Sequence, residues 1–168
     1  PALRPGRRDA MKPAMNDIAV QDKIPAGFRE LRLGHSGFMA ATGPLYGLPE
    51  GDRIVVGFRV EARHCNPNQV CHGGMLMTLA DMSLGLGTNY QAKLMRFLPT
   101  VNLTCDFLAP APLGCWVEAR TDVLRTTRNL TFGQCMITAD GVACARASGI
   151  MKVAGEADPR FRLDRLFG

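Results

Sequence analysis

The fold is decided by a long apolar stretch at residues 73–90, GGMLMTLADMSLGLGTNY. Within it, Met75, Leu79, Met82 and Leu86 recur at i, i+4, i+7 and i+11, which is the spacing of one face of an α-helix. The spacing therefore predicts a helix over residues 73–90. At 1.5 Å per residue, such a helix is roughly 27 Å long.

Alternation of apolar and polar residues predicts strands around this helix. They are expected at residues 53–63, 101–107, 115–124, 130–138 and 142–153. The pair Asp140-Gly141 favours a tight hairpin between the last two strands, so the sheet is expected to be antiparallel. Five or six strands at about 4.8 Å each are as wide as the helix is long. One long helix can therefore lie across one curved sheet, which makes the fold class α+β.

The ends of the chain are less regular. Residues 28–33 are expected to form a short helix, and residues 38–46 an irregular first strand broken by Gly43 and Pro44. Residues from 155 onward are expected to close over the surface. Residues 1–26 show no apolar period and are predicted to be a tail, which leaves 27–168 as a single domain.

Composition and charge narrow the function classes. Of the 168 residues, 46% are hydrophobic and 21% charged, which excludes a disordered chain, a collagen and a coiled coil. No apolar run reaches about 18 residues and no export signal is visible, so we expect no membrane partner. The net charge of +5 suits a phosphate-bearing small molecule and does not require nucleic acid, which we do not expect as a partner.

The chain has six cysteines, and four of them lie inside apolar runs, as buried free thiols do: Cys105, Cys115, Cys135 and Cys144. A reducing, cytoplasmic location is therefore expected. Cys65 and Cys71 flank a loop beside His64 and His72, so a zinc site is an alternative. Their separation by five residues exceeds the two to four usual for zinc pairs, and we expect no metal.

Asp81 is the only charged side chain within residues 73–92. A carboxylate on an apolar helix is unfavourable unless it is exposed, paired or used in chemistry. The helical wheel places it beside Met77, Leu84 and Thr88, away from the predicted core face. It can be a catalytic acid, an exposed solubilising residue or a buried carboxylate bonded to a hydroxyl, and its position on the helix does not decide among these.

Gly73 and Gly74 stand where the helix is predicted to begin. Without a Cβ, they expose backbone N–H groups at the positive end of the helix dipole, where a carbonyl oxygen can bind and become an oxyanion. Alternatively, they only allow close packing. Gly73 and Asp81 are about 12 Å apart along the helix, so one carbonyl cannot contact both. Two helices antiparallel across a two-fold axis would bring them together, which predicts a site between subunits of a homodimer.

The residues at the helix start, together with Asp81, resemble those of a known protein family. Residues 72–81, HGGMLMTLAD, preceded by Asn66, resemble the active-site signature of the hotdog-fold thioesterases. They are most similar to the phenylacetate-degradation (PaaI-like) branch, which hydrolyses acyl-CoA thioesters. Residues 100–110 (TVNLTCDFLAP), 128–132 (RNLTF) and 140–145 (DGVACA) resemble later strands of that family. The resemblance covers roughly residues 38–153.

The resemblance implies a hotdog fold, a cofactor-free hydrolysis of acyl-CoA and four catalytic residues. Gly73 matches the glycine whose N–H polarises the thioester carbonyl. Asp81 matches the carboxylate that acts as general base or nucleophile. Asn66 matches a residue that places the carbonyl or the water, and Thr100 one that orients the water.

Five further residues are expected to bind substrate or shape its site. His72 and Gly74 shape the helix start, and Met77 offers an adaptable wall for the acyl group. Arg125 and Arg128 are expected to contact the phosphates of CoA. The family relationship further favours a homodimer that pairs into a dimer of dimers.

Two other functions remain open. A non-catalytic acyl-CoA-binding module on the same fold would not need Asp81. A hotdog hydratase or dehydratase would pair a catalytic histidine with an acid, and no such placement is evident. No Gly-x-Ser-x-Gly motif occurs, and neither Ser83 nor Cys71 has an evident His–acid partner that would make it a nucleophile.

Overall fold

The computed structural model describes residues 24–33 and 37–167. The predicted tail, residues 1–26, thus lies outside the described residues apart from 24–26, and the single domain over 27–168 stays a prediction.

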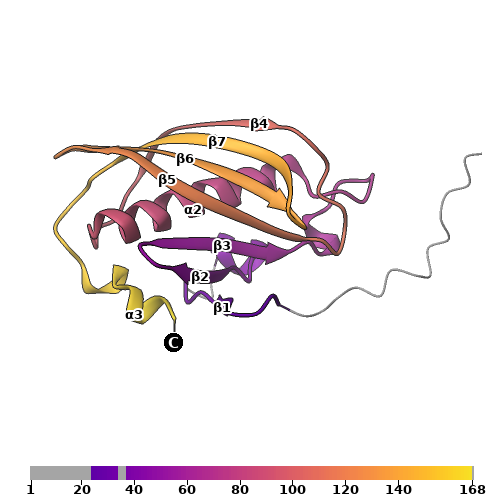
Figure 1. Cartoon of the computed structure of the whole chain (residues 1–168), viewed down its shortest axis with the longest axis horizontal. Coiled ribbons are helices and arrows are strands. Elements are labelled where there is room, and N and C mark those ends of the chain that lie inside the picture. Colours follow the sequence, from indigo (N-terminus) through magenta and orange to yellow (C-terminus); the bar gives the residue numbers. More distant parts are fainter. Residues whose placement is uncertain (1–23, 34–36, 168) are drawn as a thin grey trace, which may run out of the picture.

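One long helix, α2 (Gly73–Ala92), packs against the concave face of one antiparallel sheet (Figure 1). The sheet has the order β1-β2-β3-β5-β6-β7-β4, so β4 forms one of its edges. The strands are β1 (Arg29–Glu30), β2 (Tyr46–Glu50), β3 (Arg53–Arg59), β4 (Thr100–Phe107), β5 (Trp116–Thr126), β6 (Leu130–Ala139) and β7 (Val142–Lys152). The predicted α+β class is confirmed, and the two-residue β1 brings the sheet to seven strands instead of five or six.

Two local predictions near the N-terminus are wrong. Residues 28–33 do not form a helix, because Arg29 and Glu30 pair with β2 as strand β1. Residues 37–42 form a short helix, α1 (Gly37–Thr42), instead of a strand. Its sequence, GFMAAT, is rich in helix-forming Ala and Met, and such a short segment carries no period that decides between the two structures.

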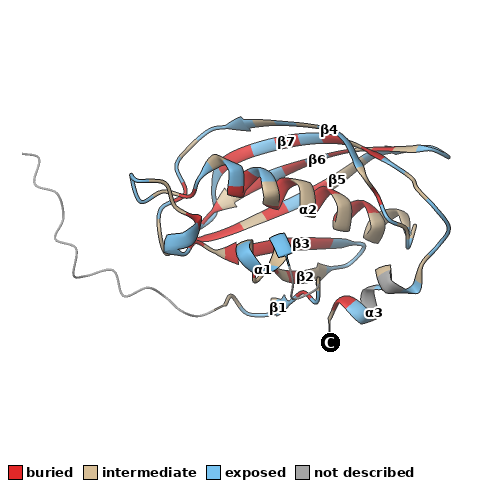
Figure 2. Ribbon diagram, turned by 180° about the vertical axis from the view of Figure 1, so that it is seen from behind, coloured by how far each residue is buried: buried red, intermediate tan, exposed pale blue. Residues whose placement is uncertain are grey.

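The buried face of α2 also differs from the prediction. Leu84 and Thr88 are fully buried against the sheet, whereas Met82 and Leu86 of the predicted core stripe are only half-buried. Gly87 explains the choice of face, since a Cβ there would lie 2.6 Å from a side-chain carbon of β5. Figure 2 shows buried and half-buried residues alternating along α2. Because α2 is apolar on nearly every side, close approach at small residues decides its rotation. Met82 and Leu86 are thereby turned toward a cavity.

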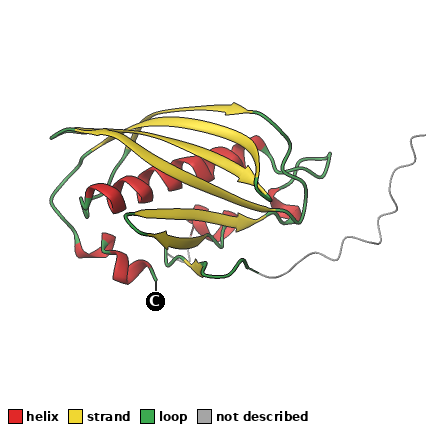
Figure 3. Ribbon diagram, in the orientation of Figure 1, coloured by secondary structure: helices red, strands yellow, loops and turns green. Residues whose placement is uncertain are grey.

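The segment after β7 crosses from the end of the sheet to the N-terminal strands (Figure 3). It contains a 3₁₀ turn (Pro159–Phe161) and α3 (Leu163–Leu166). Its backbone is bonded to the loop after α2, where Asp158 N–H donates to Met95 O at 2.7 Å, and to the N-terminal segment, where Arg32 N–H donates to Leu166 O at 2.9 Å. The expected closure over the surface is thus present in the structure.

In the part of the chain that the structure describes, no helix combines the length and the hydropathy needed to cross a bilayer.

Candidate functional site

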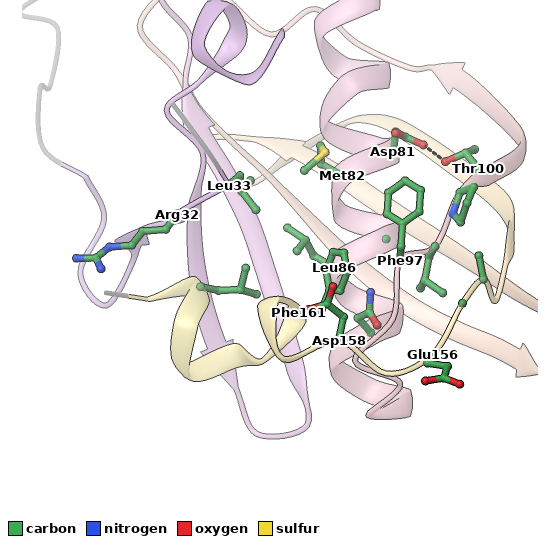
Figure 4. Close-up of a pocket in the computed structure, with 17 residues that line it drawn as sticks. Arg32, Leu33, Asp81, Met82, Leu86, Phe97, Thr100, Glu156, Asp158 and Phe161 are labelled. Carbon is green, nitrogen blue, oxygen red and sulfur yellow. Dashed lines mark hydrogen bonds between the residues drawn. The ribbon is translucent and has the colours of Figure 1, made fainter. Parts of the chain in front are cut away.

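Asp81 lies on the side of α2 that faces away from the sheet, at the wall of a cavity of about 1120 Å³ (Figure 4). Its Oδ1 accepts a hydrogen bond from the hydroxyl of Thr100, the first residue of β4, at 2.5 Å. Within residues 24–33 and 37–167, no hydrogen bond engages the other carboxylate oxygen. Asp81 is therefore bonded to a hydroxyl but is only half-buried, unlike the buried carboxylate of one alternative, and it borders open space where a ligand can reach it.

The start of α2 is capped by His72. The imidazole Nδ1 accepts the N–H of Gly74 at 2.9 Å, so the neutral ring carries its proton on Nε2. The expectation that His72 shapes the helix start agrees with this cap. The N–H of Gly73 has no preceding carbonyl within the helix, and no hydrogen bond in the described parts of the chain uses it. This N–H is the donor left for a ligand.

Gly73 is also a point of close packing. A Cβ at Gly73 would lie 3.0 Å from Cζ of Phe107, whose side chain is half exposed at the end of β4. The two interpretations of this glycine are therefore compatible: the residue lets an aromatic ring approach the helix end and leaves its N–H accessible. Phe107 was not among the predicted site residues, although it begins the aromatic-x-x-Pro ending of residues 107–110.

Gly73 and Asp81 do not meet within one chain. The helix between them is unbroken, so eight residues separate their Cα atoms by about 12 Å. Asn66 lies in the loop before the helix. Its Oδ1 accepts the N–H of Asn68 at 2.9 Å in an Asx turn, which leaves its side-chain NH₂ group as a donor.

The other predicted binding residues lie outside the cavity. Met77 is on an exposed part of α2, 36% exposed. Arg125, near the end of β5, and Arg128, in the turn between β5 and β6, are both exposed. Within one chain, the structure thus places Asp81 with Thr100, and His72 with the two glycines, but does not bring Met77, Arg125 or Arg128 to either group.

Two alternative nucleophiles are unsuited to that role. Ser83 is fully buried, and its hydroxyl is hydrogen-bonded to Thr121 Oγ1 at 2.9 Å. Burial raises the pKa of the Cys71 thiol to about 12, so almost no thiolate forms near neutral pH.

The residues considered for zinc have other partners. His64 Nδ1 accepts the N–H of Glu61 at 3.0 Å, and His72 caps α2. Burial, and next the nearby Arg63 charge, lower the pKa of His64. Among the described residues, no three His, Cys, Asp or Glu side chains are grouped as ligands of a metal ion would be.

Residues far apart in sequence line the cavity beside Asp81. Met82 and Leu86 contribute from α2, Phe97 and Leu98 from the loop before β4, and Phe161 from the C-terminal segment. Of these, Met82 and Leu86 were assigned to the core face of the helix from the sequence. The pairing of Phe97 with Phe161 carries no sequence signal, because it depends on the path of the chain after β7.

Comparison with known proteins adds independent information. Residues 68–145 match the Thioesterase superfamily. The chain is 31% identical over 128 residues to the Pseudomonas aeruginosa protein PA0474, provisionally named an esterase, and the match covers 76% of this chain and 95% of that protein. A match of 71 residues at 35% identity relates it to the acyl-coenzyme A thioesterase THEM4 of Xenopus laevis, over 42% of this chain and 31% of that one.

A solved structure shows the same architecture. A mutant of the phenylacetic acid degradation protein PaaI from Thermus thermophilus superposes with a TM-score of 0.61 and 26% identity, covering 70% of this chain and 98% of that one. Because its sheet and helix match those of PaaI and PA0474 is related over almost its whole length, the chain belongs to the thioesterase superfamily and has the hotdog fold, as its sequence predicted.

Proposed function

We propose that this protein hydrolyses acyl-CoA thioesters to a carboxylic acid and free CoA. The observation that carries the proposal is the position of the Asp81 carboxylate, which is hydrogen-bonded to Thr100 at the wall of the cavity. Asp81 lies on α2, the same helix that offers the N–H of Gly73 at its start. The relationship to a Xenopus protein named an acyl-coenzyme A thioesterase supports CoA esters as the substrate class.

The residues divide the work of hydrolysis. Asp81 takes a proton from water as the water oxygen bonds to the thioester carbon, or attacks that carbon itself to form a mixed anhydride, which water hydrolyses to the acid after the thiolate has left, regenerating Asp81. The carbonyl oxygen becomes an oxyanion and is stabilised by the N–H of Gly73 at the positive end of α2. Asn66 helps to place the carbonyl or the water. The C–S bond then breaks, and the CoA thiolate leaves with little need of an acid.

The two halves of the site come from different protomers in this proposal. Because Gly73 and Asp81 are about 12 Å apart in one chain, the carbonyl needs Gly73 of a second protomer. The edge strand β4 exposes apolar side chains, including Val101 (61%) and Phe107 (54%), which a second copy would cover. A dimer of such dimers, in a reducing cytoplasm that keeps all six cysteines as free thiols, completes the assembly we propose.

The remaining predicted residues are proposed to contact the bound substrate. Arg125 and Arg128 are exposed cations on one hairpin and are proposed to bind CoA phosphates. Met77, half exposed on α2, is proposed to contact the acyl thioester from the second protomer.

The test is a thiol-release assay over acyl-CoA esters with wild-type protein and Asp81→Asn. We expect CoA release by the wild type and a loss of at least about two orders of magnitude in kcat for the variant. Binding of the esters without release of CoA by either protein would instead identify a non-catalytic acyl-CoA-binding module.

A further inference from the structure

We propose that the cavity beside Asp81 binds the acyl group, that it selects a bulky, apolar and uncharged one, and that Phe161 is a specificity-determining residue. This inference rests on the proposed thioester hydrolysis and names its substrate class.

The size and lining of the cavity favour a large apolar group. Its volume of about 1120 Å³ slightly exceeds the range of small-molecule pockets, about 300–1,000 Å³, and an acetyl group would leave nearly all of it empty. The cavity begins at Asp81 and Thr100, and Met82 and Leu86 form the adjoining wall along α2. An acyl chain whose carbonyl lies at Asp81 would therefore extend along apolar side chains.

Two phenylalanines form the wall opposite α2. The rings of Phe97 and Phe161 stack with centroids 6.2 Å apart and an angle of 29° between their planes (Figure 4). Phe97 is nevertheless 60% exposed. An acyl group lying against this pair would cover the exposed ring surface and gain its burial energy.

Phe161 belongs to a fixed wall. Its segment is bonded to the loop after α2 at two points, because Arg96 Nη1 donates to Gly155 O at 2.7 Å in addition to the bond between Asp158 and Met95. At the other end, Leu166 is buried and its carbonyl accepts the N–H of Arg32. The C-terminal part of this wall, which includes Phe161, lies beyond residues 68–145, which match the superfamily, so it adds a specificity element to the shared core.

The charges around the cavity disfavour an anionic acyl end. The carboxylates of Asp81 and Asp158 both border the cavity, and the guanidinium of Arg32, on its far side, points away from it (Figure 4). A terminal carboxylate on the acyl group would thus lose water and lie beside Leu86 and the aromatic pair, in a cavity that Asp158 also borders. Uncharged acyl groups are the class that fits.

The experiment measures kcat/KM for acetyl-, octanoyl- and suberyl-CoA, the last being the octanoyl chain with a terminal carboxylate. We expect kcat/KM to rise by up to about fourfold per methylene from acetyl to octanoyl. Suberyl-CoA is expected to have a kcat/KM at least about tenfold lower than octanoyl-CoA.

Phe161→Ala should lower the ratio of kcat/KM for octanoyl-CoA to that for acetyl-CoA by about fivefold, and Phe161→Leu should lower it by less. The control Phe38→Ala removes an exposed ring on α1, outside the cavity, and should keep the ratio.

Non-hydrolysable thioether analogues separate binding of the acyl group in the cavity from hydrolysis of the thioester. Calorimetry should show the wild type binding octyl-CoA thioether more tightly than ethyl-CoA thioether, with a smaller difference in Phe161→Ala. Tight octyl binding without hydrolysis of any ester would overturn the proposed function and keep the acyl cavity. Hydrolysis with equal efficiency for acetyl-, octanoyl- and suberyl-CoA, or an unchanged ratio in both Phe161 variants, would overturn this inference and keep the function.

Discussion

The hydroxyl of Thr100 donates to Oδ1 of Asp81 at 2.5 Å, and this bond joins the first residue of the edge strand β4 to the middle of α2. It links the two elements that border the cavity at this point. Because one carboxylate oxygen is held, the other has a defined direction from which to act on water or on a carbonyl carbon. We therefore propose that Thr100 is a positioning residue for Asp81.

Removing this hydroxyl should impair catalysis more than stability. We expect Thr100→Val to lower kcat about tenfold to a hundredfold, because a misplaced catalytic group loses that much. Thr100→Ser keeps the hydroxyl and should retain most of the activity. Thermal unfolding should shift little, since Thr100 is exposed. A Thr100→Val protein with wild-type kcat would show that Asp81 does not depend on this bond.

Proline at position 73 offers a precise test of the oxyanion donor. Gly73 is the first residue of α2, where proline is tolerated, and His72 already has the extended backbone that precedes proline. Gly73→Pro removes the N–H and should lower kcat by about 10² to 10³, while the helix content by circular dichroism stays unchanged.

Gly73→Ala is the matched control for crowding. It keeps the N–H but places a Cβ 3.0 Å from the exposed ring of Phe107, which can shift. Its loss of kcat should therefore be at least about tenfold smaller than that of the proline variant. Equal losses in the two variants would mean that packing, and not the N–H, explains this glycine.

The cysteines should differ in reactivity according to burial. Burial raises the pKa of Cys71, Cys115 and Cys135 to about 12, and it also raises that of buried Cys144. With a chromogenic disulfide reagent at pH of about 8, we expect the half-buried Cys65 and Cys105 to react first, and all six thiols only after unfolding. Rapid reaction of Cys71 in the folded protein would contradict its burial.

His64 should make stability depend on pH. Its pKa in the folded protein lies below the unfolded value of 6.5, chiefly because of burial, so the unfolded state binds more protons as the pH falls below that value. The free energy of unfolding should therefore decrease from a pH of about 7 toward 5. His64→Asn keeps an acceptor for Glu61 N–H without a titrating group, and its unfolding free energy should change less over this range. Parallel pH profiles for the two proteins would exclude His64 as the source.

The sequence predicted the regular core of this fold because its patterns are long. Strands β5, β6 and β7 alternate over ten or eleven residues each, and Asp140-Gly141 marks the hairpin between β6 and β7. The N-terminal errors arose in segments of two to six residues, where pairing with β2 decides the structure. The face of α2 was misassigned because its apolar residues surround the axis and the approach at Gly87 sets the rotation.

The residues of the candidate site also differ in how far the sequence could predict them. Asp81 was a candidate because it is the only charge on α2, and Gly73 because of its position at the helix start, but the family resemblance was needed to assign either a catalytic role. Thr100 was identified only through family resemblance, since nothing in its own neighbourhood marks it as a partner of Asp81. The cavity wall around Phe161 was beyond prediction, because it joins residues more than sixty positions apart, such as Phe97 and Phe161.

The central claim is that each active site combines Asp81 of one protomer with Gly73 of another. It is tested most directly by mixing Asp81→Asn with Gly73→Pro protein after dissociation and reassociation. Each mixed dimer then contains one intact and one doubly defective site, so random pairing should restore about a quarter of the wild-type kcat from two nearly inactive parents. Activity that stays at the level of the parents, in samples shown to contain mixed dimers, would contradict the claim.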